Sequence, residues 1–149
     1  MQDSALNQAN QSIQLGIVRV YVKDLSFESP RSPQIFRTQW RPEIKLDVSV
    51  TPRHIEESLF EVVLAINVEA RENKDLGFIV EVEQCGLFDV RGPEGQPMEH
   101  ALRVVCPNVL FPYARQAVDQ ALVAGGFPPL MLAPINFELP NHQKPANLS

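Results

Sequence analysis

The sequence lacks the features that mark several large classes of protein. Its 149 residues carry 13 basic and 18 acidic side chains, a net charge of −5, whereas a protein that binds nucleic acid through the phosphates is usually basic. No apolar run approaches the roughly 20 residues that a membrane-spanning helix needs. With 44% hydrophobic and 21% charged residues, the composition is typical of a globular domain. We therefore expect one folded domain that binds no nucleic acid and does not insert into a membrane.

Residues for catalysis or cofactor binding are also scarce. The two cysteines, Cys85 and Cys106, form no C-x-x-C pair, and no histidine lies at a metal-ligand spacing from them. The stretch GPEGQP lacks the lysine and the following helix of a phosphate-binding loop. The sequence thus predicts no catalytic residue, no metal and no cofactor. One enzymatic alternative stays open, a small thiol enzyme that uses Cys106 together with His100.

Both ends of the chain are polar. The first residues, MQDSALNQANQS, show no cationic patch followed by an apolar stretch, so they do not resemble a secretory signal. We expect a cytoplasmic protein with two reduced thiols. We also expect flexible tails at residues 1–14 and 140–149 on either side of a single domain at residues 15–139.

Four segments show the alternation of apolar and polar residues that is typical of β-strands. The first carries apolar residues on both faces, which indicates that both faces are covered. The short connections between the other three predict an antiparallel meander, and Gly86 suggests a bulge or bend in the last strand. The four segments are Leu15–Glu28, Glu43–Thr51, Leu59–Arg71 and Gly77–Arg91.

The residues after the strands have a helical pattern. Asn108 is a candidate cap, Pro112 fits only near the first turn, and residues 113–124 are good helix formers that end before Gly125-Gly126. One side of this helix carries small residues, which either allow close approach of another element or simply reflect the helix propensity of alanine. These residues are Ala114, Ala117, Ala121 and Ala124.

Two proline-rich segments carry large apolar side chains. The connection between the first two strands contains Pro30, Pro33 and Pro42, which exclude a regular element across it, and the segment after the helix is expected to be extended. Their apolar residues either cover the core or line a groove for extended apolar peptide. We select as candidates for that groove Phe36, Trp40, Phe127, Leu130 and Phe137.

One face of the predicted sheet is acidic. The alternation places seven acids and three bases on the outward side of the three regular strands, so this face is either a solvated surface or a docking surface for a basic partner. The acids are Glu43, Asp47, Glu61, Glu69, Glu81, Glu83 and Asp89, and the bases are Lys45, Arg71 and Arg91.

Several long motifs make the chain resemble the SecB family of bacterial protein-export chaperones. They are YVKDLSFESP (residues 21–30), the pattern W-x-P-E-x-K-L-D (40–47), LFEVVL (59–64), GFIVEVEQCGLF (77–88), CPNVLFPYAR (106–115) and FPPLMLAPINF (127–137). The similarity covers residues 17–137. The resemblance implies an α+β subunit with a four-stranded antiparallel sheet followed by a long helix, assembled into a homotetramer that is a dimer of dimers.

The resemblance also implies a function. Such chaperones hold precursor proteins unfolded in the cytoplasm and pass them to the motor ATPase SecA, without a cofactor of their own. The family's contacts with SecA correspond here to Asp24, Glu28, Ile79 and Glu81. We place the oligomer interface at Ala114, Ala117 and Ala121, where the helix presents its small residues. Relatives commonly continue into a second helix after the N-F pair, which Pro140 and the short tail disfavour here.

Overall fold

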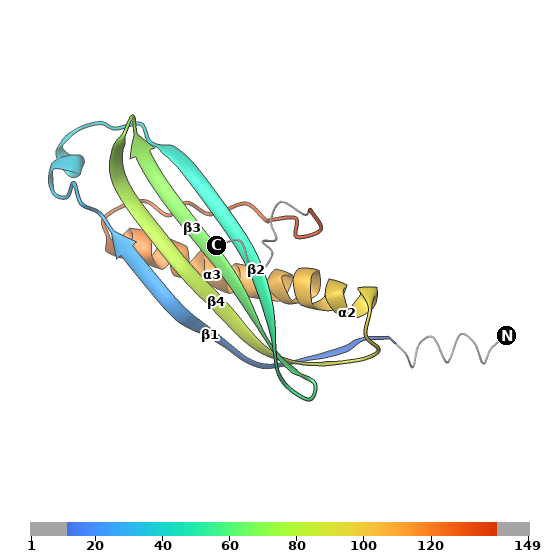
Figure 1. The fold of residues 1–149 in the computed structure, drawn as a ribbon. Coiled ribbons are helices and arrows are strands. Elements are labelled where there is room, and N and C mark those ends of the chain that lie inside the picture. The colour runs from blue at the N-terminus through green and yellow to red at the C-terminus, as the bar shows by residue number, and fades with distance from the viewer. Residues whose placement is uncertain (1–11, 140–149) are drawn as a thin grey trace.

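The computed structural model of the protein describes residues 12–139. Four strands form one antiparallel sheet in the order β1-β4-β3-β2 (Figure 1). The predicted meander of the last three strands is therefore confirmed, and the first strand lies at the far edge beside β4. Most of the predicted N-terminal tail, the predicted C-terminal tail and Pro140 lie outside the described residues. The strands are β1 (Gln14–Glu28), β2 (Glu43–Glu56), β3 (Leu59–Glu72) and β4 (Asp75–Arg91).

Strand β1 differs from the prediction that it is apolar on both faces. Its pairing with β4 shifts register between Ile17 and Arg19 and again between Val22 and Asp24. The extra residue at each β-bulge reverses the alternation of side chains. With two reversals, the paired aliphatic and phenylalanine residues of β1 all stand opposite inward-facing residues of β4. These are Leu15, Ile17, Val20, Val22, Leu25 and Phe27.

Strand β2 is longer than predicted. It continues through Pro52 to Glu56. A proline is tolerated there because β2 is an edge strand, where the missing backbone N–H costs no hydrogen bond to a neighbouring strand. The predicted inward phase of Ile44 and Leu46 is right, but both side chains are exposed in the subunit.

The two glycines of β4 allow close packing. Gly86 does not mark a bulge, because the pairing of β3 with β4 is regular around it. A Cβ atom there would lie 2.4 Å from the ring of Phe88 and 3.0 Å from Leu110 of the helix, so glycine lets the helix approach the sheet. The register shift in this pair occurs instead at Gly77, between Ala70 and Arg71 of β3.

The helical region begins earlier than predicted. A short helix α2 (Gln96–His100) leads into a π-helical stretch η2 (Ala101–Val105) and then into α3 (Cys106–Ala124). Asn108 is therefore inside the helix and caps nothing, and Pro112 lies in the helix interior. The helix ends where expected, at Gly125, whose N–H donates to the carbonyl of Ala121.

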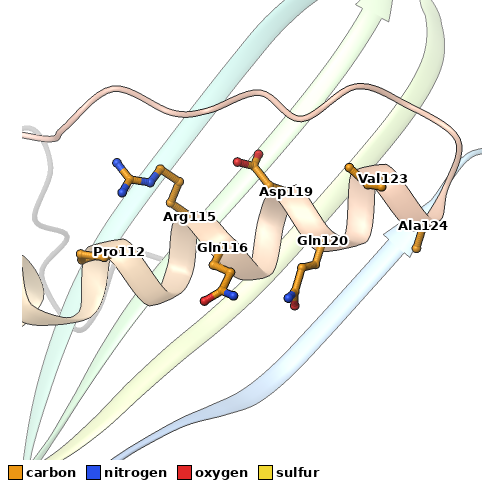
Figure 2. Close-up of a pocket in the computed structure, with 7 residues that line it drawn as sticks. All are labelled: Pro112, Arg115, Gln116, Asp119, Gln120, Val123 and Ala124. Carbon is orange, nitrogen blue, oxygen red and sulfur yellow. The ribbon is translucent and has the colours of Figure 1, made fainter.

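The core lies between α3 and the inner face of the sheet, which the helix crosses (Figure 1). Beyond α3 the chain turns back and runs without regular structure along the helix (Figures 1 and 2), as predicted for residues 127–137. The connection between β1 and β2 is irregular, as expected, apart from one 3-10 turn, η1 (Gln34–Arg37). Helix residues in this core include Leu110, Phe111, Ala114, Val118 and Leu122.

Candidate functional site

Aromatic side chains from four parts of the chain meet at the end of the sheet where α3 stops. Phe127 is their common neighbour, and its ring centroid lies 5.0 Å from that of Phe78, 5.3 Å from Phe36, 6.1 Å from Trp40 and 6.3 Å from Phe27. The tilted and edge-to-face arrangements are those that aromatic pairs prefer. We call these five residues the aromatic cluster.

Glycines make the cluster possible. A Cβ atom at Gly77 would lie 2.3 Å from the Trp40 ring, and one at Gly125 would lie 2.2 Å from the Phe27 ring. Gly126 has a φ of +91°, a conformation that glycine adopts readily, and its backbone approaches Phe36. The rings therefore occupy space that side chains at these positions would fill.

The predicted client-binding residues differ in how accessible they are. Phe36 is 50% exposed, whereas Phe127 is only 6% exposed and Phe137 only 1%. Trp40 and Leu130 are half-buried. In the structure, Phe127 and Phe137 therefore belong to the core, and the side chains that reach the surface are those of Phe36, Trp40 and Leu130.

Asp119 of α3 holds the segment after the helix in place. Its Oδ1 accepts hydrogen bonds from the backbone N–H groups of Leu130, at 3.0 Å, and Met131, at 3.2 Å. Sequence reasoning missed Asp119 because it does not show which distant backbone groups a helix residue reaches. It also missed the cluster members Phe27 and Phe78, although the neighbouring glycines are a signal that bulky groups lie close.

The outer face of the sheet carries a strip of carboxylates. Asp24 stands opposite Glu83, and Glu28 stands opposite Ile79, while Glu81 faces Ser26 of β1 and Asn67 of β3. The predicted SecA-binding residues thus share one face, with Glu83 as an addition. Among residues 12–139, no ion pair reaches these four acids. We call Asp24, Glu28, Glu81 and Glu83 the acidic strip.

Two other acids predicted to face outward form ion pairs with arginines of their own strands. Glu69 pairs with Arg71 at 3.2 Å and Asp89 with Arg91 at 3.0 Å. In both pairs the hydrogen bond from the guanidinium lowers the pKa of the carboxyl group. Glu69 and Asp89 therefore add little net charge to this face, whereas the carboxylates of the acidic strip are unpaired among the described residues, which the sequence count alone could not show.

Glu61 faces outward as predicted but is only 5% exposed. It accepts hydrogen bonds from the hydroxyl of Tyr21 and from Lys23 Nζ at 2.8 Å, and Arg53 Nη2 lies 3.4 Å away. Burial by itself raises the pKa of Glu61, but the bonds from Lys23 and Tyr21 outweigh it and hold the pKa below its ordinary value. Burial and the neighbouring carboxylate raise the pKa of Tyr21.

The predicted oligomer residues lie on α3. Ala114 is fully buried against the core of its own subunit, and Ala117 and Ala121 are half-buried. A hollow of about 710 Å³ runs along the helix (Figure 2). Figure 2 shows Arg115 and Asp119 pointing toward the segment after α3, whereas Gln116 and Gln120 point the other way.

The thiol-enzyme alternative finds little support. Cys85 and Cys106 are both free and buried, and burial raises the pKa of Cys85 to about 11 and that of Cys106 to about 12. An activated thiol has a lowered pKa and is accessible. His100 instead lies 2.9 Å from Glu138. Within residues 12–139 there is no cluster of metal-ligating side chains and no helix suited to crossing a membrane.

Comparisons with known proteins agree with the fold. The sequence profile of the SecB family, described as preprotein translocase subunit SecB, matches residues 7–146. A protein-export protein SecB from Stutzerimonas stutzeri is 46% identical over 134 residues, covering 90% of this chain and 82% of the relative. One from Legionella pneumophila is 43% identical over 132 residues, covering 89% of this chain and 82% of the relative.

A solved structure has the same fold. A Mycobacterium tuberculosis SecB-like chaperone, in complex with a ChAD peptide from an antitoxin, superposes with a TM-score of 0.65 at 17% identity. The match covers 91% of this chain and 95% of that one.

Proposed function

The chain belongs to the SecB family of protein-export chaperones, and on that premise we propose that it captures unfolded precursor proteins at its aromatic cluster and passes them to SecA through its acidic strip. The observation that carries this proposal is the separation of the two surfaces. The aromatic cluster is built on the inner side of the sheet, and the acidic strip lies on the outer side.

Client capture depends on apolar contact. Phe36, Trp40 and Leu130 offer accessible apolar surface, and the buried Phe127 packs against Phe36 and Trp40. Phe137 is buried elsewhere, near the start of the helical region, where the adjacent Glu138 contacts His100. Burial of apolar area contributes roughly 25 cal/mol per Å² without demanding a sequence, so an unfolded chain binds and a folded protein does not. The peptide complex of the M. tuberculosis chaperone supports this use of the fold.

Trp40 provides the test, because the protein has a single tryptophan. A denatured precursor should change the fluorescence of Trp40, and a folded protein of the same size should not. Normal capture of precursors by a Trp40→Ala variant, together with unchanged fluorescence in the parent, would exclude Trp40 from the site.

Docking of SecA depends on charge. The carboxylates of the acidic strip have no cationic partner among the described residues, so a basic surface on SecA would supply one, with Ile79 as an apolar contact point. Salt screens exposed charges but not apolar burial. Raising the salt concentration should therefore weaken SecA binding far more than precursor binding, and equal salt dependence would contradict the division of roles.

We place the protein in the cytoplasm as a homotetramer, a dimer of dimers. Two exposed apolar surfaces support assembly, one on β1 with Ile17, Val22 and Leu25, and one on α3 with Tyr113 and Val123. Closed symmetric assembly would cover such surfaces.

Sedimentation tests the assembly. The unaltered protein should sediment with about four times the 16.7 kDa mass of one chain. Ala117→Glu, on the half-buried side of α3, should split it, whereas Lys74→Glu in the exposed β3–β4 turn should not. A stable monomer of the unaltered protein would disprove the tetramer.

A further inference from the structure

We propose that Glu61 is a positioning residue that fixes how the edge strand β1 is seated on the sheet, and so decides which of its side chains form the acidic strip. The effect on SecA docking rests on the proposed function. Its structural content, the seating of β1, can be tested without SecA.

The contacts of Glu61 reach across the sheet. Tyr21 and Lys23 belong to β1, which is separated from β3 by the whole of β4, yet both side chains donate hydrogen bonds to the Glu61 carboxylate. Arg53 approaches the same carboxylate from β2 on the other side. One buried acid on β3 therefore joins both edge strands, and we call these four residues the Glu61 clasp.

The Glu61 clasp holds the second bulge of β1. Val22 pairs with Gln84 and Asp24 pairs with Glu83, so Lys23 is the extra residue. The clasp fastens this extra residue and Tyr21 just before it. Gln84, itself buried, donates a hydrogen bond of 3.1 Å to the carbonyl of Tyr21 and holds the backbone beside the bulge.

The bulge decides which side chains face outward. Side chains alternate along a strand, so an extra residue exchanges the faces of all residues on one side of it. With Lys23 bulged, Asp24 and Glu28 stand beside Glu83 and Ile79 on the outer face. In a regular strand continuing from Val22, Asp24 would share the inner face of Val22 and be lost from the acidic strip.

The same bulge serves the inner face. Phe27 stands opposite Val80 on the core side, and its ring fills the space beside Gly125 in the aromatic cluster. If the faces were exchanged, Phe27 would point outward and Asp24 would point inward. The seating of β1 therefore links the acidic strip to the aromatic cluster.

Two variants test the proposal. Glu61→Leu removes the acceptor of the clasp, and Lys23→Met removes a donor while keeping a long apolar side chain. The matched control is Glu69→Gln, because Glu69 lies on the same face of the same strand but pairs only with Arg71 within that strand. Lys23→Arg, which keeps the charge, is the conservative substitution that should restore the function.

The first readout is SecA affinity in the full-length protein. We expect Glu61→Leu and Lys23→Met to raise the Kd for SecA by about tenfold or more. Glu69→Gln and Lys23→Arg should bind SecA as the parent does.

The second readout is the pairing of β1 with β4. It is measured by NMR contacts between the backbones of residues 24 and 83. Glu61→Leu should lose these contacts, and the ultraviolet titration of Tyr21 should move to lower pH because its acceptor is gone.

The outcomes are distinguishable. Unchanged pairing of residues 24 and 83 in either variant would overturn the proposal, whatever SecA does. If the parent does not bind SecA, the proposed docking function fails, but the NMR contacts still decide the role of Glu61. Should Glu61→Leu not fold, Lys23→Met decides, because the Lys23 side chain is 42% exposed and its loss leaves no buried gap.

Discussion

The aromatic cluster and the acidic strip are built in opposite ways. The rings of the cluster pack on one another and on glycines; Phe78 and Phe127 belong to the buried core, and Phe27 and Trp40 pack against it. The carboxylates of the strip protrude from backbone that β-sheet pairing already fixes, and no ion pair in the described chain uses them. Substitution of a buried ring in the cluster therefore alters stability and binding together, whereas substitution in the strip alters binding alone.

Phe127→Ala should have the largest effect. Phe127 touches the other rings of the aromatic cluster and is nearly buried, and truncation of a buried phenylalanine costs about 3–5 kcal/mol. Urea unfolding should show this loss, and precursor binding should fall with it. A variant that keeps its stability would show that the cluster is not part of the core.

Neutralising the acidic strip should leave stability intact. The triple variant Asp24→Asn, Glu28→Gln, Glu81→Gln should weaken SecA binding by about tenfold or more, because several charges act together although exposed single charges contribute little. Its urea unfolding curve and its precursor affinity should match those of the parent. Loss of precursor binding would show that the two surfaces overlap.

Glu61 is the exception on the outer face, because it is buried and bonded. Since its folded pKa is lowered, its ionised form stabilises the protein above the ordinary carboxyl pKa of 4.5, and the contribution is lost as the pH falls through the folded value. Glu61→Gln should cost about 1–2 kcal/mol at pH 7, since its partner Lys23 is partly solvated and its partner Arg53 is largely solvated.

The difference between Glu61→Gln and the parent should be constant around neutral pH and shrink below pH 4.5. Urea unfolding at several pH values measures it. Glu69→Gln serves as the control, because the carboxyl group of Glu69 is partly solvated. If the difference in free energy of unfolding between Glu61→Gln and the parent grew toward acid pH, the proposed role of the Glu61 carboxylate would be wrong.

Phe36→Ala should have the smallest effect on stability of the substitutions in the aromatic cluster. Half of the Phe36 side chain is already exposed. The free energy of unfolding should therefore fall by about 1 kcal/mol or less, within the range of surface substitutions and small packing losses. Precursor affinity should nevertheless fall measurably. This variant separates capture from stability within the aromatic cluster, which Phe127→Ala cannot do.

Much of the fold could be predicted from the sequence because it depends on local periodicity. The inward phases of β2, β3 and β4, the meander and the end of the helix before Gly125 all follow from alternation and from glycine. The start of the helix could not be predicted, because Pro112 marks a helix start by its local preference but is accommodated inside α3. Tertiary packing overrode a propensity there.

The candidate site was predicted in part for the same reason. The four-position spacing of Asp24 and Glu28 along one strand predicts that they share a face, and they do. Which face they share depends on the bulge at Lys23. In the sequence this bulge is visible only as a change of phase between Val22 and Leu25, which the alternation pattern alone presents as a strand with two apolar faces. Likewise Phe27 joins Phe127 only because the chain folds back after α3.

By itself, the sequence determined the strand faces of the meander, the excess of acidic residues on the outer side and the membership of a family, since each is carried by residues close together along the chain. Only the tertiary structure decided which acids stay unpaired, which aromatic rings reach the surface and where Glu61 finds Tyr21, Lys23 and Arg53. These properties depend on side chains from distant strands meeting in space, and no periodicity along one strand encodes what stands on another.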